Sequence, residues 1–456
     1  MQDPVVDQIL AHVERVEAHG VPEAARVAAK AFIADTLAVG VADIATSWRG
    51  EVLDTLATTD GAREATVWGS GERPPLVQTV MLNAYQIHGQ EFDCVHDAAV
   101  VHPMATVLPV LLGWAEREGD VSGARLIRAV AVAVDVAVTL GLSSRAPMRF
   151  FRPANAGGFG ATVGLAMLAG LDAEQLRGAL GIYYGQCSGT MQAHAEATPQ
   201  LAMRMGFAAR SAVAAVELAR RGMPGPRAPI SGTFGYFALF DGMADPAPFD
   251  ALGRHWRICE LSHKPFPSGR ATHGGIDALQ RLMREDGVTA DRVVSVRFRV
   301  PPLTARLIGR PALAGMTTNY ARLCLQYVAA VCLLRGAVGL GDFSAPALCD
   351  PATLALARRL AVVDDGNPDP NALTPLRVEI DLAGGRSGEY AVDEVLGSPA
   401  RSLSSDTAKA KFMACWRSIP KLIPQQGETL WDGVATLDAL DEVRVLAAIT
   451  TPRGAA

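Results

Sequence analysis

The chain has 456 residues, too many for one ordinary hydrophobic core, so two or three domains are expected. With 49% hydrophobic and 20% charged residues, the composition is that of a globular protein. A net charge of -5 and a pI near 6.0, with no run of Lys or Arg, argue against nucleic acid or an anionic membrane as a partner. The expected ligand is a small molecule.

The cysteines and the N-terminus both indicate a cytoplasmic protein. The seven cysteines are scattered without a CxxC pair, which is typical of buried thiols in a reducing compartment. The first stretch, MQDPVVDQILAHVERVEAHG, carries acids where an export signal would carry bases. The apolar stretch 124–142 is interrupted by Arg125, Arg128 and Asp135, which favours a buried helix over a membrane span.

From residue 4 to about residue 255, the spacing of apolar residues predicts one helix after another. Glycine or proline marks most of the joins between them. After an amphipathic N-terminal helix, the predicted helices are 21–41, 74–90, 104–118, 123–141, 158–170, 172–189 and 206–222. This pattern predicts a large all-α domain.

The pattern changes near Trp256. Residues 292–300 alternate apolar and polar as a strand does, and residues 376–392 do so as a hairpin around GGRSG, with helices between the two stretches. Helical spacing returns at 406–416 and 436–449. We therefore predict a mainly α protein. Residues 1–257 and 398–456 would form the all-α helical domain, and residues 258–397 an inserted α+β lid domain.

The first polar constellation is EFDCVHDAAVVHP, which runs from Glu91 to Pro103. Proline fits the first turn of a helix, so His102 is expected at the N-cap or just before it. A helix start attracts carboxylates. A polar loop with a capping histidine is the simpler interpretation. The density of ionisable groups, which include Asp93 and His96, favours a functional loop instead.

A metal site at this loop is an alternative. His88, Glu91, His96 and His102 could supply imidazole and carboxylate ligands. No ligand spacing such as HExxH is present, however. The sequence therefore predicts a site without a metal ion.

The second constellation is HKPFPSGRATHGG, residues 263–275. Prolines hold Lys264 in an extended segment, and Thr272 is the predicted N-cap of a helix whose first turn holds His273. A single lysine is usually a solvated surface charge. Lys264, Arg270 and His273 lie within one short segment, which favours an anion pocket. Two such pockets predict a substrate with more than one carboxylate.

Two other features remain open. FRPANAGGFGA brings Arg152 to a glycine-rich helix start that either holds an anion or serves helix packing, since its glycines match neither the Walker nor the Rossmann pattern. Tyr327 lies on an apolar helix, where a core tyrosine is the usual case. No GxSxG or kinase signature is present in the sequence.

These segments carry a resemblance to a known family. HGQEFDCVHDAAVVHP resembles the polar loop of the 2-methylcitrate dehydratase family, also called MmgE/PrpD, and KPFPSGRATHGGIDAL resembles that family's lysine segment. The closing GSPARSLSSDTAKAKF and several helices between also match in order. The resemblance covers nearly the whole chain.

The resemblance implies a helical domain and a smaller α+β domain, usually in a homodimer, with the active site between the domains and no metal or organic cofactor. Activities in the family include dehydration of 2-methylcitrate, decarboxylation of cis-aconitate and epimerisation of iminodisuccinate. We expect His102 and Lys264 to face one cleft from opposite domains. The expected catalytic residues are Glu91, Asp93, His102, Lys264, His273 and Tyr327, and the expected substrate-binding residues are His96, Arg152, Arg204 and Arg270.

The chain also departs from the family pattern. Cys94 replaces the second aspartate of the polar loop, and Val95 stands where a threonine is often found. Leu201 stands where many members have a lysine, and Arg204 is the only base nearby. Gly269 stands where cis-aconitate decarboxylases have a histidine. The changes at Leu201 and Gly269 argue against that decarboxylase.

The shared chemistry of these reactions is proton removal, or loss of CO2, beside a carboxylate, which builds negative charge on oxygen. Lys264 and Arg270 suit the stabilisation of that charge, and histidine suits proton transfer near pH 7. We predict a cofactor-independent lyase of the dehydratase type acting on a small di- or tricarboxylate. The alternatives are an epimerase or isomerase that uses the same proton abstraction, a cis-aconitate decarboxylase-like lyase, and an inactive carboxylate-binding relative.

Overall fold

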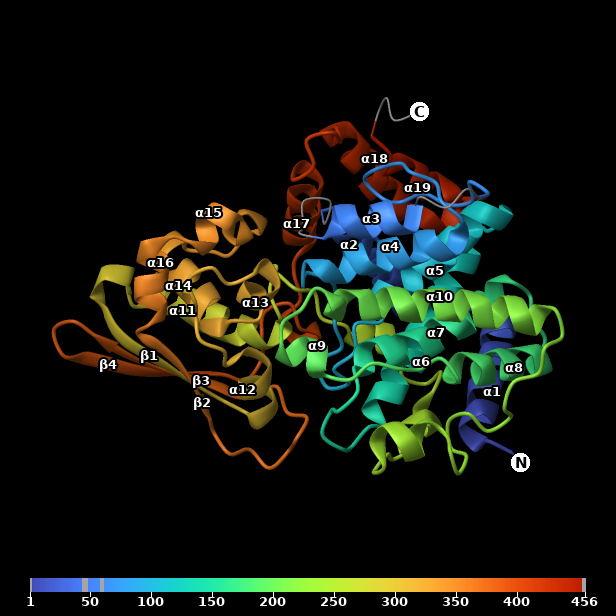
Figure 1. Ribbon diagram of the computed structural model, residues 1–456, viewed down its shortest axis with the longest axis horizontal. Coiled ribbons are helices and arrows are strands. Elements are labelled where there is room, and N and C mark those ends of the chain that lie inside the picture. The colour runs from blue at the N-terminus through green and yellow to red at the C-terminus, as the bar shows by residue number, and fades with distance from the viewer. Residues whose placement is uncertain (1, 43–47, 58–60, 453–456) are drawn as a thin grey trace. The chain divides into compact units, whose positions relative to one another are not determined.

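The structure is a computed structural model and describes residues 2–42, 48–57 and 61–452 (Figure 1). Contacts within it divide the chain into two compact units. The helical unit comprises the residues up to Met191, Gln200–Leu261 and the residues from Ser404 onward, and the mixed unit comprises Gln192–Pro199 and Ser262–Leu403. The predicted inserted lid domain, residues 258–397, stays a prediction. Gln192–Pro199, which holds α9 (Gln192–Ala195), was expected in the helical domain.

The helical unit contains the predicted helices, two of which begin six residues earlier than predicted. They are α1 (Pro4–His19), α2 (Glu23–Ala42), α4 (Leu76–Gly89), α5 (Met104–Glu118), α6 (Gly123–Leu142), α7 (Arg152–Leu168), α8 (Ala173–Tyr184), α10 (Gln200–Arg220) and α17 (Ser405–Arg417). Two short helices, α3 (Arg49–Ala57) and α18 (Pro424–Ala435), were not predicted. The sequence PQQGETLWDGVA of α18 carries glycines that weaken a helical pattern.

The predicted helix 436–449 is wrong as a single element. A 3-10 turn at Leu437–Ala439 is followed by extended backbone at Leu440, and only then does α19 (Arg444–Ile449) begin. A capping serine or threonine is absent from this second start, where Val443 makes no side-chain cap bond.

Glycines allow α7 to lie close to its neighbours. A Cβ atom added at Gly160 would lie 2.2 Å from the carbonyl oxygen of Ala133 on α6, and one added at Gly158 would lie 1.8 Å from the hydroxyl oxygen of Tyr183 on α8. Neither site has room for a side chain. Helix packing therefore accounts for these glycines of FRPANAGGFGA.

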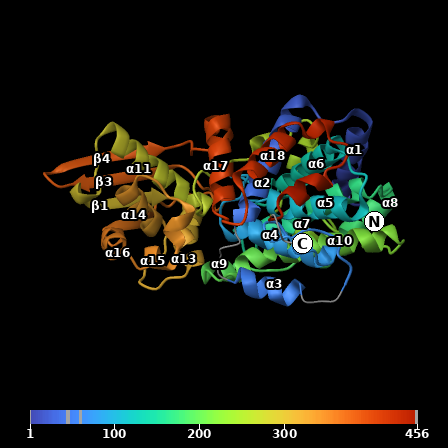
Figure 2. The same cartoon turned by 90° about the horizontal axis from the view of Figure 1, so that it is seen from above.

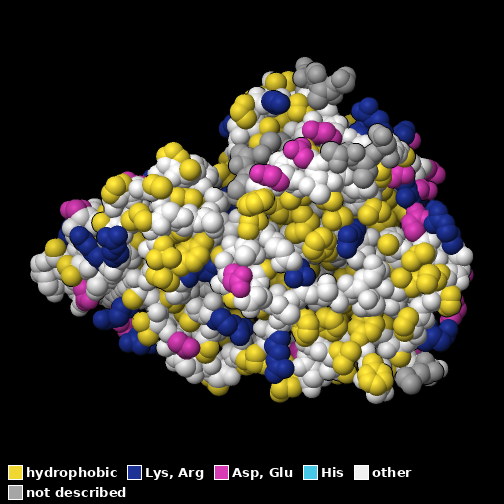
Figure 3. Space-filling model, in the orientation of Figure 1, with side chains coloured by type: hydrophobic (Ala, Val, Ile, Leu, Met, Phe, Trp, Pro, Cys, Tyr) yellow, Lys and Arg dark blue, Asp and Glu magenta, His cyan; other side chains and the backbone are white. Residues whose placement is uncertain are grey.

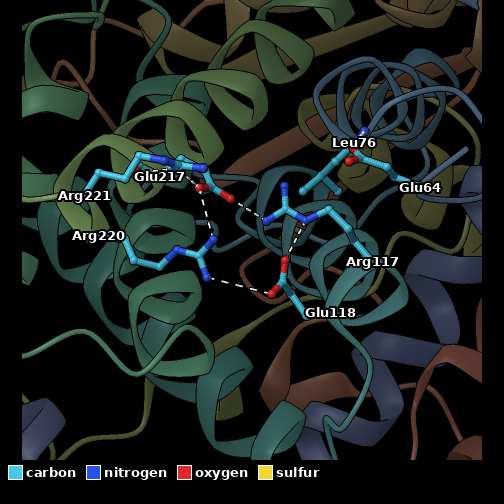
Figure 4. Close-up of polar contacts among 7 residues, drawn as sticks. All are labelled: Glu64, Leu76, Arg117, Glu118, Glu217, Arg220 and Arg221. Carbon is cyan, nitrogen blue, oxygen red and sulfur yellow. Dashed lines mark hydrogen bonds and ion pairs between the residues drawn. The ribbon is translucent and has the colours of Figure 1, made fainter. Parts of the chain in front are cut away.

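Helices α4, α5, α7 and α10 lie side by side in this unit (Figures 1 and 2). Glu64 accepts the backbone N–H of Leu76 at 2.7 Å and so satisfies one donor at the start of α4. Arg117 of α5 pairs with Glu217 of α10 (Figure 4). Two helices from the C-terminal part of the chain, α17 and α18, pack against α2.

The mixed unit is built on a four-stranded sheet of order β2-β1-β3-β4. The predicted strand and hairpin are present as β1 (Val293–Val300), β3 (Leu376–Leu382) and β4 (Arg386–Val392). β2 (Leu360–Asp364) was missed and pairs with β1 in parallel. It has only 5 residues, too few to show a clear alternation.

One face of this sheet is covered by helices. Val296 and Phe298 of β1 and Val378 of β3 are buried, whereas Arg297 and Arg299 between them are exposed and pair with Glu379. Such alternation is typical of a sheet with one buried face. The covering helices α11 (His273–Glu285), α14 (Leu325–Arg335) and α16 (Pro351–Ala357) lie on the same side in Figure 1.

Two further expectations concern thiols and membranes. All seven cysteines lie in the described part of the chain, and each is a free thiol. Among the helices of residues 2–42, 48–57 and 61–452, none combines the length and the apolar character needed to cross a bilayer.

Candidate active site

The segment that joins α4 to α5, residues 90–103, is here called the site loop. α4 ends at Gly89, and Pro103 occupies the N-cap of α5, so His102 lies just before the helix, as predicted. Backbone hydrogen bonds between His96 and Val101, 2.9 and 3.4 Å long, close the loop into a small hairpin. The helix start thus fixes one end of the loop and the hairpin fixes its middle.

Asp93 joins two histidines. Its Oδ2 atom lies 3.0 Å from Nδ1 of His88 and 3.0 Å from Nδ1 of His102. An ionised carboxylate can only accept hydrogen bonds, so both Nδ1 atoms carry a proton in the neutral rings and both Nε2 atoms carry a lone pair. The rings meet edge to face at 4.9 Å.

His102 is the most accessible member of this group. Its side chain is 11% exposed, against 2% for His88 and 0% for Asp93. On the face drawn in Figure 3, no described histidine side chain is visible, in keeping with the burial of these rings. A group that exchanges a proton with a ligand must reach it, and His102 meets this need best.

Glu91 lies beside His88 rather than His102. Its Oε1 atom is 3.7 Å from Nε2 of His88, which forms an ion pair when that ring is protonated. The backbone of Glu91 is left-handed, with a φ of 49°, and so is that of Val100, with a φ of 51°. The conformation is rare for a β-branched residue and costs about 1–3 kcal/mol. Strain of this kind often marks functional loops.

His96 is engaged on both sides of its ring. Nε2 donates to Glu260 at 3.0 Å, and Nδ1 accepts the backbone N–H of Ala99 at 3.1 Å. The hydrogen bond from His96, with the Arg257 guanidinium second, lowers the pKa of Glu260 to about 2. His96 is thus tied to the helical unit on one side and to its own loop on the other.

The two predicted arginines of the helical unit differ in their relation to the loop. Arg152, buried at the start of α7, donates from Nη1 to the carbonyl oxygen of Ala99 at 3.2 Å, and burial lowers the pKa of its guanidinium. Arg204 packs over Gly189, where an added Cβ would lie 2.7 Å from Nη1. Arg204 makes no hydrogen bond or ion pair with the site loop, all of which the structure describes.

In the mixed unit, the lysine segment, residues 263–275, packs against residues 396–397. The N–H of His263 donates to the carbonyl oxygen of Gly397 at 2.9 Å, and Nη1 of Arg270 donates to that of Leu396 at 2.8 Å. Gly397 has a φ of 88°, and a Cβ there would lie 2.2 Å from the oxygen of His263. Two of the segments that carry the resemblance, KPFPSGRATHGG and GSPARS, are therefore neighbours. Lys264 is 0% exposed.

His273 begins α11, as predicted, and its Nε2 atom donates to the carbonyl oxygen of Ser268 at 3.1 Å. Thr272 occupies the predicted N-cap position, but its hydroxyl donates to Gly269 and caps nothing. The reason is local, because a 3-10 turn at Arg270–Thr272 precedes α11 and keeps Thr272 helical.

Tyr327 lies in the core of the mixed unit. Its hydroxyl donates to the carbonyl oxygen of Asp342 at 2.5 Å and lies 3.2 Å from that of Ala347. Desolvation raises the pKa of this phenol. A role on a substrate would require the hydroxyl to exchange these carbonyl partners, and it stays a prediction.

Two residues of the site were not among the predicted catalytic or binding residues. His88 was considered only as a metal ligand, although a histidine at the end of an apolar helix directly before an acidic loop is a signal that could have found it. Glu260 is 164 residues from His96 in the sequence and belongs to no recognisable pattern.

A metal ion would find suitable donors here. One atom each from His88, Asp93 and His102 lie within 4.8 Å of one another, and all three residues are buried. Two imidazoles and a carboxylate suit Zn²⁺ or a similar ion. The Nδ1 atoms of both histidines, however, form hydrogen bonds with Asp93, and an ion bound through these atoms would replace them. The prediction of a metal-free site stays a prediction.

The fold and this site together define a mainly helical, two-unit protein with a carboxylate-bound histidine just before a helix start. Residues 7–248 match the MmgE/PrpD N-terminal domain and residues 266–431 match the MmgE/PrpD C-terminal domain, so the chain belongs to the MmgE/PrpD family. The cis-aconitate decarboxylase-like protein oryM of Aspergillus oryzae is 23% identical over 448 residues, which cover 92% of each chain. The family and this relative indicate a lyase-type enzyme.

Proposed function

We propose that the protein is a cofactor-independent lyase of the dehydratase type that acts on a small di- or tricarboxylate. The observation that carries the proposal is the bridge from Asp93 to His102, which leaves Nε2 of His102 as a base at the more accessible end of the group. Membership of the MmgE/PrpD family supports the lyase class.

In the proposed reaction, Nε2 of His102 removes a proton from the carbon next to a substrate carboxylate. The resulting imidazolium is stabilised by Asp93, which holds the ring in place, and His88 fixes the other side of that carboxylate. The imidazolium then returns its proton to the departing hydroxyl group. The products are an alkene and water, and the enzyme is unchanged.

The negative charge that forms on the substrate carboxylate needs cations. We assign this task to Lys264 and Arg270. Nη1 of Arg270 donates to the carbonyl oxygen of Leu396 at 2.8 Å, and this contact orients the guanidinium. A preorganised cation in a buried setting stabilises such charge more than a solvated one does.

Gly269 favours a dehydratase over a cis-aconitate decarboxylase. A Cβ at this position would lie 2.7 Å from Cδ2 of Leu323, so a histidine there would require Leu323 to move.

An epimerase using the same proton abstraction is the second candidate. We further propose that the enzyme acts as a homodimer, as the family resemblance implies, and in the cytoplasm, as the scattered cysteines indicate.

The test is a panel of hydroxy- and amino-polycarboxylates incubated with the enzyme in heavy water. Exchange of a substrate proton identifies a substrate whatever follows proton removal, and new alkene absorbance in the ultraviolet separates dehydration from epimerisation. A protein that binds members of the panel but exchanges no proton would be an inactive carboxylate-binding relative, and the proposal would be wrong.

A further inference from the structure

We propose that Glu260 is a positioning residue for the reaction, which sets the geometry of the site loop through His96. The inference rests on the proposed function, since it concerns the alignment of His102. It gives His96 a role in holding the loop in place of the direct substrate contact that the sequence suggested.

The loop needs an external support because its middle is strained. Val100 adopts a φ of 51° and Val101, the residue directly before His102, is paired with His96. A strained conformation persists only where surrounding contacts enforce it. The N–H of Ala99, next to the strained residue, is held by Nδ1 of His96 at 3.1 Å.

The ring of His96 links this backbone to Glu260. Because Nδ1 accepts from Ala99, the proton lies on Nε2, which donates to Oε2 of Glu260 at 3.0 Å. A carboxylate acceptor strengthens this bond. Glu260 thereby fixes the tautomer and the direction of His96, as an outer carboxylate fixes a metal-binding or catalytic histidine.

Glu260 is itself anchored to buried residues of the helical unit. It ends a 3-10 turn, Arg257–Glu260, and Nη1 of Arg257 lies 2.9 Å from both carboxylate oxygens. The backbone N–H of Arg257 donates to Asp135 of α6 at 2.7 Å. Asp135 accepts from His12 of α1 at 3.1 Å, and both of these side chains are 0% exposed.

This chain of contacts ends at the proposed base. His102 directly follows the hairpin and reaches Asp93 over 3.0 Å, a distance that tolerates little movement. Catalytic groups must be held within about 0.5 Å of the productive position. Loss of the Glu260 contact would release His96 and, with it, the backbone that precedes His102.

Four variants remove individual atoms of the contacts that His96 makes with Glu260 and Ala99. Glu260→Ala removes the acceptor, and Glu260→Gln keeps a carbonyl oxygen for His96. His96→Asn retains an acceptor for the N–H of Ala99 at the position of Nδ1, but its side chain is too short to reach Glu260. His96→Gln retains a donor for Glu260 at the position of Nε2, but no acceptor at the position of Nδ1. Both His96 variants break the link.

We expect Glu260→Ala, His96→Asn and His96→Gln each to lower kcat by ~10-fold or more, with KM changed less than ~3-fold. Glu260→Gln should restore kcat to within ~3-fold of the wild-type value. The melting temperature should fall by no more than a few degrees, because the side chain of Glu260 is 36% exposed.

Glu217→Ala is the matched control. Glu217 is another arginine-paired carboxylate of the helical unit, held by Arg117, Arg220 and Arg221 on α5 and at the end of α10 (Figure 4). These partners lower its pKa, as those of Glu260 do. Its removal should leave kcat unchanged.

The outcomes separate the inference from the proposed function. If His102→Asn abolishes turnover while Glu260→Ala and both His96 variants keep wild-type kcat, the positioning role is wrong and the proposed base stands. A Glu260→Ala variant that only melts earlier, with kcat intact, shows a purely structural residue and also overturns the inference. If His102→Asn retains turnover, the proposed function is wrong, and the inference that rests on it is wrong as well.

Discussion

The site loop and the lysine segment hold their polar side chains in different ways. In the site loop, charged partners bind the rings, since Asp93 bridges His88 and His102 and Glu260 receives His96. In the lysine segment, the contacts of Arg270 and His273 described above go to neutral carbonyl oxygens. A carboxylate selects the tautomer of an imidazole and stabilises its protonated form, whereas a carbonyl orients a cation without cancelling its charge.

The difference matches two chemical tasks. A loop that moves protons needs rings with defined tautomers, and a segment that binds carboxylates needs cations whose charge remains available. The histidines at the site loop contact carboxylates, and Arg270 and His273 contact backbone carbonyl oxygens. The predictions below test this contrast, from the largest expected effect to the smallest.

Lys411 is expected to be essential for the stability of the site loop. Its ammonium group lies 2.6 Å from Asp35 and 3.0 Å from the carbonyl oxygen of Phe92, the residue before Asp93. Lys411→Met leaves a buried carboxylate without its cation, so the free energy of unfolding should fall by about 3–5 kcal/mol in urea titrations. Lys409→Met, on the same helix but with an exposed partner, should lower the free energy of unfolding far less. Equal losses of unfolding free energy in the two variants would show that the buried pair stabilises the fold no more than the exposed pair does.

Lys264 should dominate charge stabilisation. Lys264→Met keeps the apolar stem and removes the charge, so turnover of the true substrate should fall by ~100-fold or more. The fold should be intact by circular dichroism, and Lys409→Met should turn over normally. Near-normal turnover by Lys264→Met would remove the lysine segment from the reaction.

Glu260 should make stability depend on acid pH. Its carboxyl group has a pKa of about 2 in the folded protein, below the ordinary 4.5, so it stabilises the fold above pH 4.5 and this contribution is lost as the pH falls toward 2. The difference in unfolding free energy between wild type and Glu260→Gln should be about 1 kcal/mol near neutral pH, after solvent screening, and should shrink below pH 4.5. A difference that grows on acidification would contradict the proposed contact.

Removal of metal should change nothing. If Asp93 serves to orient imidazoles, dialysis against a chelator should leave turnover unaltered, and elemental analysis should find no stoichiometric metal. Activity lost on chelation and restored by one added metal would turn His88, Asp93 and His102 into a metal site.

Local sequence patterns predicted many of the helices and strands. They did not predict contacts between residues that are far apart in the sequence. Proline after His102 was enough to place it just before α5, and alternation was enough for β1, β3 and β4. The bridge at Asp93 depends on which way three side chains point, and the hairpin that directs them contains an unusual valine conformation. Spacing along the chain carries no information on such directions.

Two other features were missed for related reasons. Glu260 meets His96 only through the packing of a 3-10 turn against α6, a contact between parts of the chain that share no periodicity. The segment Gln192–Pro199 groups with the mixed unit although its sequence lies among predicted helices of the other unit. Such pairings are set by tertiary packing, and single-sequence patterns report only local preference.

The central claim is that His102, oriented by Asp93, moves the proton. Its most direct test is deuterium exchange into the substrate, catalysed in heavy water by wild type and by His102→Asn, an asparagine that keeps the polar residue before α5 without a ring base. We predict rapid exchange with wild type and at least ~100-fold slower exchange with the variant, while circular dichroism and substrate binding are preserved. Exchange at the wild-type rate by a folded His102→Asn protein would contradict the account.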